Sequence, residues 1–212
     1  MQQGLATSNN DRFTSWQSLV EYRLVIETGN GIRLPLEQVL SDTPSSWDAP
    51  LSIGQIEVGR LVATATQIPT VVRWLQRSLQ QMPAFTLHFN NFSGIPPHQV
   101  HMRIQCTAPV MQLRDQLRKL NATLELHELP AIEQASKWQL PVAESLSGMI
   151  YQQVLQHFSK QELAVSMQVT ELWLMRREHS LQPWQPMQRL PLQEAMQPSN
   201  SPWYAPCTPV RI

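Results

Sequence analysis

The stretch FTLHFNNFSGIPPHQVHMRIQ, residues 85–105, decides the fold class. In its first part apolar residues alternate with polar ones, and the same alternation returns after a turn that reads Ser-Gly-Ile-Pro-Pro. Alternation with a period of two is typical of a strand with one buried face. The stretch therefore predicts a β-hairpin. Its expected buried face consists of Phe85, Leu87, Phe89, Val100, Met102 and Ile104.

Helical and strand patterns alternate on both sides of this hairpin. Apolar residues at helical spacing, with a proline in the first turn, predict several amphipathic helices. We expect helices at 34–40, 66–81, 109–120 and 145–158, and further strands at 19–28, 51–61, 138–143, 163–176 and 184–192. A β-α arrangement thus occurs twice, which predicts an α+β fold with two pseudosymmetric lobes of antiparallel sheet around a central cleft.

The length of 212 residues fits one compact domain built from two lobes. We expect a polar N-terminal extension at residues 1–18, a single bilobal domain at 19–195, and a mobile tail at 196–212. The tail contains four prolines, which exclude a helix interior or a central strand. The strand expected at 163–176 needs a bulge to bring its apolar residues to one face.

Charge and cysteine content exclude several classes of protein. Lys and Arg total 16 and Asp and Glu total 16, so bulk charge attracts neither nucleic acid nor an anionic membrane, and a phosphate group must be held locally. The two cysteines, Cys106 and Cys207, are too few for a disulfide framework or a zinc site. With no signal peptide and no apolar run that could span a bilayer, we expect a cytoplasmic protein. The low charge also favours self-association.

Four segments together resemble the 2H phosphoesterase (2′-5′ RNA ligase-like) family. The order and spacing of these segments carry the resemblance, which covers about residues 20–192. They are the opening EYRLVIET at 21–28, the hairpin at 85–105, the helix MQLRDQLRKL at 111–120, and the closing VSMQVTELWLMRREHSLQPWQPMQRLPL at 165–192.

The resemblance implies a site with two His-x-Thr motifs, one in each lobe, that cleaves or forms 2′-5′ or cyclic phosphodiester bonds without a metal or other cofactor. Gln55-Ile56-Glu57-Val58 is the best match to the first motif, and the segment that begins at Gln139 is the best match to the second. Both histidines are replaced by glutamine. No histidine occurs between residues 1 and 87, so the first loss does not depend on the alignment frame.

The replaced residues cannot perform the family's chemistry. A glutamine amide can donate a hydrogen bond to a phosphate but cannot transfer its proton near neutral pH. Alternation places Ile53, Gln55, Glu57 and Gly59 on one strand face, so that Glu57 would repel a phosphodiester unless it is protonated or paired. We therefore predict a catalytically inactive protein whose cleft, with Gln55, Glu57 and Gln139, binds a nucleotide, an RNA end or another small polar ligand.

Two alternatives remain open at this stage. In the first, the protein is an active phosphodiesterase with relocated chemistry, in which His88, His101 and Arg103 form an anion site on the polar face of the hairpin. In the second, the protein is an interaction module whose tail, with its prolines and Trp203, docks onto a partner or a second subunit. No binding to DNA or to a membrane is expected.

Overall fold

The computed structural model describes residues 18–44, 47, 51, 53–105 and 107–194. All but one residue of the expected N-terminal extension, and the whole of the expected tail at 196–212, lie outside the described residues. Cys106 and Cys207 also lie outside them.

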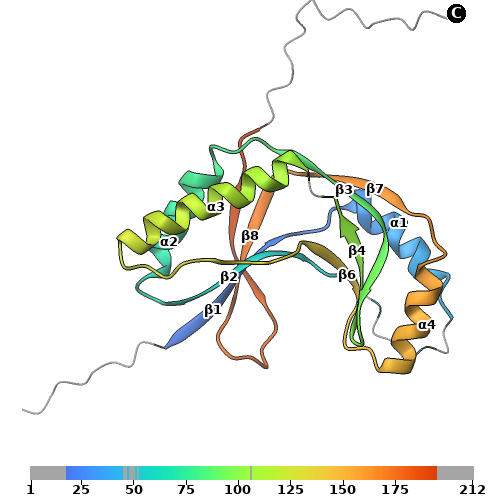
Figure 1. The fold of residues 1–212 in the computed structure, drawn as a ribbon. Coiled ribbons are helices and arrows are strands. Elements are labelled where there is room, and N and C mark those ends of the chain that lie inside the picture. Colours follow the sequence, from blue (N-terminus) through green and yellow to red (C-terminus); the bar gives the residue numbers. More distant parts are fainter. Residues whose placement is uncertain (1–17, 45–46, 48–50, 52, 106, 195–212) are drawn as a thin grey trace, which may run out of the picture.

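Two antiparallel sheets form the centre of the molecule (Figure 1). Each strand is hydrogen-bonded antiparallel to its neighbours within its sheet. Sheet A has the order β5 (Glu133–Gln134), β2 (Ile56–Thr64), β1 (Leu19–Ile26), β8 (Glu171–Arg177) and β9 (Gln185–Pro191). Sheet B has the order β6 (Gln139–Ala143), β4 (Gln99–Ile104), β3 (Phe85–Ile95) and β7 (Ala164–Val169). The predicted α+β class with antiparallel sheets in two lobes is confirmed.

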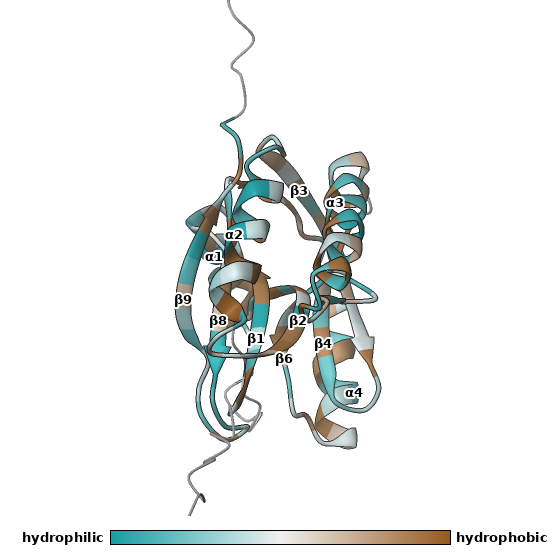
Figure 2. Ribbon diagram, turned by 90° about the vertical axis from the view of Figure 1, so that its left-hand side faces the viewer, coloured by the Kyte–Doolittle hydropathy of each residue, from teal (hydrophilic) through white to brown (hydrophobic). Residues whose placement is uncertain are grey.

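The helices lie along the two sheets. Helices α2 (Ile68–Leu79) and α3 (Ala108–Leu126) contact each other, α2 contacts β9 of sheet A, and α3 contacts β3 of sheet B. Helices α1 (Asn30–Ser41) and α4 (Gly148–Phe158) lie beside sheet B (Figure 1). Figure 2 shows apolar residues concentrated on the inner strands β1, β2 and β8, whereas the outer strand β9 is mostly polar.

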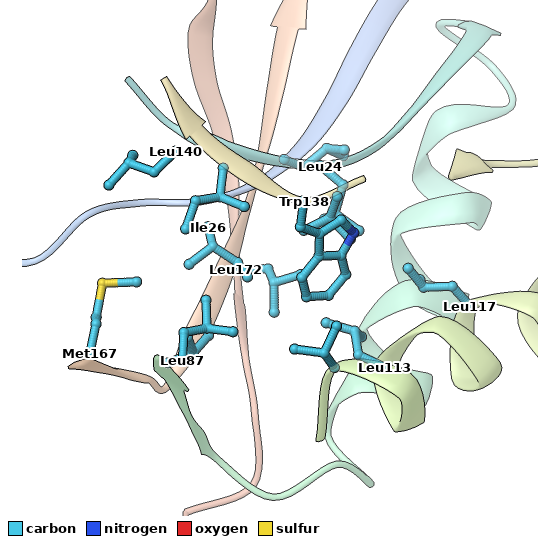
Figure 3. Close-up of a cluster of buried hydrophobic side chains, with 14 of the residues drawn as sticks. Leu24, Ile26, Leu87, Leu113, Leu117, Trp138, Leu140, Met167 and Leu172 are labelled. Atoms are coloured by element: carbon cyan, nitrogen blue, oxygen red, sulfur yellow. The ribbon is translucent and has the colours of Figure 1, made fainter. Parts of the chain in front are cut away.

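The buried side chains of both sheets meet in one hydrophobic core (Figure 3). Leucines from α3 pack into the same core, and the Trp138 indole lies among them. The residues labelled there are Leu24, Ile26 and Leu172 of sheet A, Leu87, Leu140 and Met167 of sheet B, Leu113 and Leu117 of α3, and Trp138. Sharing one core couples the stability of the two lobes.

The expected strand at 163–176 is wrong, because this segment forms two strands that belong to different sheets. β7 ends at Val169 in sheet B, and β8 begins at Glu171 in sheet A. The apolar residues occupy odd positions up to Val169 and even positions from Leu172. A bulge within one strand or a change of sheet can each produce this switch, and the local pattern does not distinguish them.

Two helix starts also differ from the prediction. Helix α1 begins at Asn30, so that Pro35 lies inside the helix and not in its first turn. Helix α2 begins at Ile68, two residues after the expected start at 66, and Gln67 precedes it without a side-chain capping hydrogen bond. Helix ends depend on local hydrogen bonds that propensity alone does not resolve.

A bulge in β2 changes which residues face the cleft. In β1, Leu24 pairs with Gly59 and the next residue, Val25, pairs with Glu57. The expectation that Gly59 shares a face with Glu57 is therefore wrong, and Arg60 takes that place. A Cβ at Gly59 would meet the Glu133 carbonyl oxygen at 2.8 Å, because this glycine lies against the edge strand β5.

We predict that Gly59→Ala destabilises the protein by about 1–3 kcal/mol, the usual cost of overpacking, because the contact is with backbone and cannot rotate away. Gly148→Ala is the matched control, since a Cβ there meets nothing within 4 Å. Urea unfolding of both variants measures the effect. Equal stabilities for the two variants would refute the close approach of β5 to Gly59.

Candidate functional site

A polar cavity of about 660 Å³ lies between the two sheets. We call it the cleft cavity. Sheet A contributes Arg23, Glu57 and Arg60, and sheet B contributes Gln99, Gln139 and Pro141. The remaining walls consist of Arg33, Ile53, Gly54, Gln55, Ala135, Ser136, Lys137 and Glu144.

The two segments aligned with the lost motifs face each other across this cavity. The Gly54 amide donates a hydrogen bond of 2.9 Å to the Pro141 carbonyl, which ties the start of β2 to β6. The three residues expected in the cleft, Gln55, Glu57 and Gln139, all line its wall. The structure thus brings Gln55 and Gln139, which are 84 positions apart in the sequence, into one cavity wall.

Each glutamine belongs to a chain of hydrogen bonds. Arg23 Nη2 donates to Gln55 Oε1 at 3.1 Å, and Gln55 Nε2 donates to Glu27 Oε1 at 3.2 Å. On the other wall, Gln139 Nε2 donates to Gln99 Oε1 at 3.0 Å. These bonds orient the amides, so that both glutamines present fixed polar groups to the cavity.

The Glu57 carboxylate is paired, which removes the repulsion expected for a phosphodiester. Arg60 donates from Nε and Nη2 to its two oxygens at 2.5 and 2.8 Å, and the Arg23 Nη1 lies 3.8 Å away. The hydrogen bonds that Arg60 donates to the Glu57 carboxylate raise the pKa of Arg60 above its ordinary value. The bulge in β2 makes this pairing possible, because it brings residues 57 and 60 to the same face.

Positive charge is concentrated in the cleft cavity of a chain whose formal net charge is zero. Four cationic side chains line it, and two carboxylates oppose them. They are Arg23, Arg33, Arg60 and Lys137 against Glu57 and Glu144. Among the described lining residues there is no histidine and no cysteine. The cavity therefore attracts anions, and its described lining offers no imidazole or thiol for proton transfer.

Arg23 is the most enclosed of these cations. Its guanidinium stacks on one side of the Trp184 ring at 4.6 Å, and Arg177 lies 4.5 Å from the same ring. Burial lowers the pKa of Arg23, and the Glu57 carboxylate opposes that effect. A guanidinium remains charged at neutral pH in any protein environment of this kind. Its Nε has no hydrogen-bond partner within the described structure.

A second cavity of about 450 Å³ adjoins the first. We call it the β4 cavity. It shares Ser136, Lys137 and Gln139 with the cleft cavity. His101 and Arg103, two members of the alternative anion site, line it together. The third member, His88, is exposed and lines a different cavity, beside Thr107 and Gln112.

His101 is buried in the wall of the β4 cavity, with 8% of its surface exposed. Burial lowers the pKa of this histidine, and the charges of Lys137 and Arg103 lower it further. Its Nδ1 has no hydrogen-bond partner in the described part of the chain. The side chain is therefore a neutral imidazole at neutral pH.

Sequence reasoning missed most of the cations. It selected residues by alignment with a lost motif, and Arg33, Arg60 and Lys137 lie outside that alignment. Arg23 carried a signal, because it is a cationic residue on the polar face of the first expected strand. No local pattern shows that residues 23, 33, 60 and 137 line one cavity.

Within the described ranges, no cluster of three or more His, Cys, Asp or Glu residues could hold a metal ion. No helix there is both long and apolar enough to cross a membrane.

Comparisons with known proteins show similarity in structure but not in sequence. No protein-family model matches the chain, and no curated protein matches it in sequence. The crystal structure of E. coli LigT complexed with NADP+ superimposes with a TM-score of 0.58 and 15% identity, covering 82% of this chain and 98% of that one. TT0787 of Thermus thermophilus gives 0.58 and 12% identity over 82% and 98% of the two chains. A further crystal structure of a phosphoesterase gives 0.57 and 15% identity over 82% and 99%.

The chain therefore has the LigT-like fold. The resemblance to 2H phosphoesterases is confirmed at the level of the fold, and identities of 12–15% fit a divergent chain.

We predict that His101 makes the folded state sensitive to acid. Because the pKa of folded His101 lies below the ordinary 6.5, the unfolded chain binds a proton there first as the pH falls, and stability is lost. His101→Gln removes this contribution. As the pH falls below about 6.5, the free energy of unfolding should therefore decrease more in the wild type than in His101→Gln. Denaturant unfolding over a pH series measures it, and parallel curves would contradict the prediction.

Proposed function

We propose that this protein binds a phosphate-bearing ligand, a nucleotide or an RNA end, in the cleft cavity and does not hydrolyse it. One observation carries the proposal. The positions aligned with the two His-x-Thr motifs face a cavity lined by four cations and three glutamines, without a histidine among its described residues.

The cavity suits a phosphate group. Arginine presents a planar set of donors that matches phosphate oxygens, and lysine adds a point charge. The side chains of Arg33 and Lys137 are exposed and make no hydrogen bond or ion pair with other described residues, so their donors are available to a ligand. Arg60 already neutralises Glu57, and therefore the carboxylate does not cancel the remaining cations.

The structural neighbours support this class of ligand. E. coli LigT, which has the same fold, has been crystallised in complex with NADP+, 3′-AMP, ATP and phosphate. Each of these ligands carries phosphate.

Hydrolysis lacks its proton-transfer groups. Cleaving a phosphodiester requires a general base for the nucleophile and a general acid for the leaving group, and each contributes roughly 10²- to 10⁴-fold to the rate. The resemblance aligns Gln55 and Gln139, which both line the cavity, with those groups, and their amides do not titrate near neutral pH. Both oxygens of Glu57 are occupied by Arg60, so this carboxylate is not free to accept a proton from a nucleophile.

The alternative of relocated chemistry concerns the β4 cavity. There, His101 and Arg103 lie together, but His88 lines another cavity. If the protein is active by this route, the activity must be lost in His101→Ala with the fold retained. The same experiment can therefore decide between the two proposals.

We predict binding without turnover. Calorimetric titration with 3′-AMP and with 2′,3′-cyclic AMP should show saturable binding, while chromatography of the same mixtures shows no new product. Arg33→Gln and Lys137→Gln should each weaken binding roughly fivefold, as expected for one exposed charge contact. Arg73→Gln and Lys160→Gln are matched controls, because both residues are exposed and outside the two cavities.

Two outcomes would overturn the proposal. If neither nucleotide binds, the cleft cavity is not a nucleotide site. The second outcome is hydrolysis of 2′,3′-cyclic AMP at a rate proportional to the concentration of purified protein. If His101→Ala abolishes this activity, the proposal of an inactive cleft gives way to the relocated chemistry. Equal weakening by the controls and by the cavity variants would show that binding is nonspecific.

A further inference from the structure

We infer that the edge of β3 next to α3 is a strand-docking site, and that its occupant is the segment Ala195-Met196-Gln197, which follows the last described residue, Glu194. Docked there, the segment adds a short parallel strand to sheet B. The site shares no lining residue with the cleft cavity or the β4 cavity, so its occupation does not depend on the ligand proposed for the cleft.

The start of β3 has a strand partner on one side only. β3 begins at Phe85, and its pairing with β7 also begins there. On the other side, the register with β4 begins only at Phe89, because β4 ends at Ile104, shortly before α3. The first residues of β3 therefore have an open edge toward α3.

Backbone hydrogen bonds mark both ends of this open edge. At one end, the Gln193 amide donates to the Met82 carbonyl at 2.8 Å and the Ala84 amide donates to the Gln193 carbonyl at 2.8 Å, which is the pattern of a parallel bridge. At the other end, the Gln105 amide donates to the His88 carbonyl at 2.9 Å. Successive residues of a strand direct their backbone groups to opposite edges, so the even-numbered residues from 82 to 88 share this edge.

Thr86 lies between these two ends and has no strand beside it on this edge within the described structure. A cavity of about 380 Å³ occupies the place of the missing strand. Residues 83–86 form one wall of this cavity, and Thr107, Pro109 and Gln112 form the other. An N–H and a C=O at an open strand edge are the groups that an added strand pairs with.

The chain itself supplies the added strand. Gln193 already pairs in parallel with Pro83, and the chain continues from there toward the residues that follow Glu194. In the same register, the Ala195 carbonyl accepts from the Thr86 amide, and the Gln197 amide donates to the Thr86 carbonyl. Docking thereby pairs both open backbone groups of Thr86.

The docked segment ends at Gln197. The next acceptor on the edge is the His88 carbonyl, which already accepts from the Gln105 amide. In this register the odd-numbered residues direct their N–H groups to β3 and the even-numbered ones direct theirs away. The first proline after Glu194 is Pro198, at an even position. A proline at such a position removes no hydrogen bond from the ladder.

Hydrogen exchange followed by NMR on the full chain tests the site. The Thr86 amide should exchange about tenfold or more slowly in the full chain than in a chain truncated after Glu194, because the docked segment supplies its acceptor. The Leu87 amide is the internal control. It is directed to the other edge, where Leu87 pairs with Met167 of β7, and its exchange should be slow in both chains.

Proline substitutions provide matched variants of the full chain. Ala195→Pro combined with Gln197→Pro removes the two N–H groups that face β3, and it should accelerate exchange at Thr86 as much as the truncation does. Met196→Pro introduces the same residue where the N–H faces away from β3. Exchange at Thr86 in this variant should stay within about twofold of the wild type.

Three outcomes would overturn the inference. The first is equal exchange of the Thr86 amide in the full and the truncated chain. The second is an equal effect of Met196→Pro and of the double proline variant. The third is slow exchange that is lost on dilution of a chain that sediments as a dimer, because the added strand then comes from a second copy. If truncation also frees the Leu87 amide, β3 itself has opened, and the proline variants decide.

Discussion

The backbone hydrogen bond from Gly54 to Pro141 is the contact on which the geometry of the cleft depends. It joins the start of β2 in sheet A to β6 in sheet B at 2.9 Å. A Cβ at Gly54 would meet the Pro141 ring at 3.1 Å, so the approach of the two segments requires a small residue at this point. Because Gln55 follows Gly54 directly and Gln139 lies two residues before Pro141, this bond determines how the two walls of the cleft face each other.

The sheets are joined a second time where the chain passes from β7 to β8. Thr170 separates the two strands, and the chain changes sheets there within one residue. Together with the common core, this crossing makes the lobes parts of one packed unit. A cavity whose walls come from two such lobes keeps its shape only if the lobes do not move independently, which is a requirement for preorganised binding.

The formal net charge of this protein is zero, but the charged side chains are unevenly distributed. The cleft and β4 cavities gather six cations, Arg23, Arg33, Arg60, Arg103, Arg114 and Lys137, and two carboxylates, Glu57 and Glu144. Three of the six have internal partners: Arg23 is hydrogen-bonded to Gln55, Arg60 is paired with Glu57, and Arg114 bonds to backbone carbonyls. The others lie at the cavity walls, where a cation with no internal partner serves an incoming anion. Under the proposed function, this division lets a chain with no bulk attraction for nucleic acid hold a phosphate locally.

The sequence by itself determined the class of fold, most of the elements and the absence of a histidine before residue 88. Alternation and helical spacing are local properties, and they predicted the hairpin of β3 and β4, the helix α3 and the strand β6. Histidine cannot be supplied by folding, so its absence before residue 88 excluded the first motif in any alignment. Tertiary structure alone decided the split between β7 and β8, the bulge that brings Arg60 beside Glu57, and the separation of His88 from His101. These depend on strand pairing between distant segments, where a shift of one residue reverses every side chain, and local patterns carry no information about which partner a strand will find.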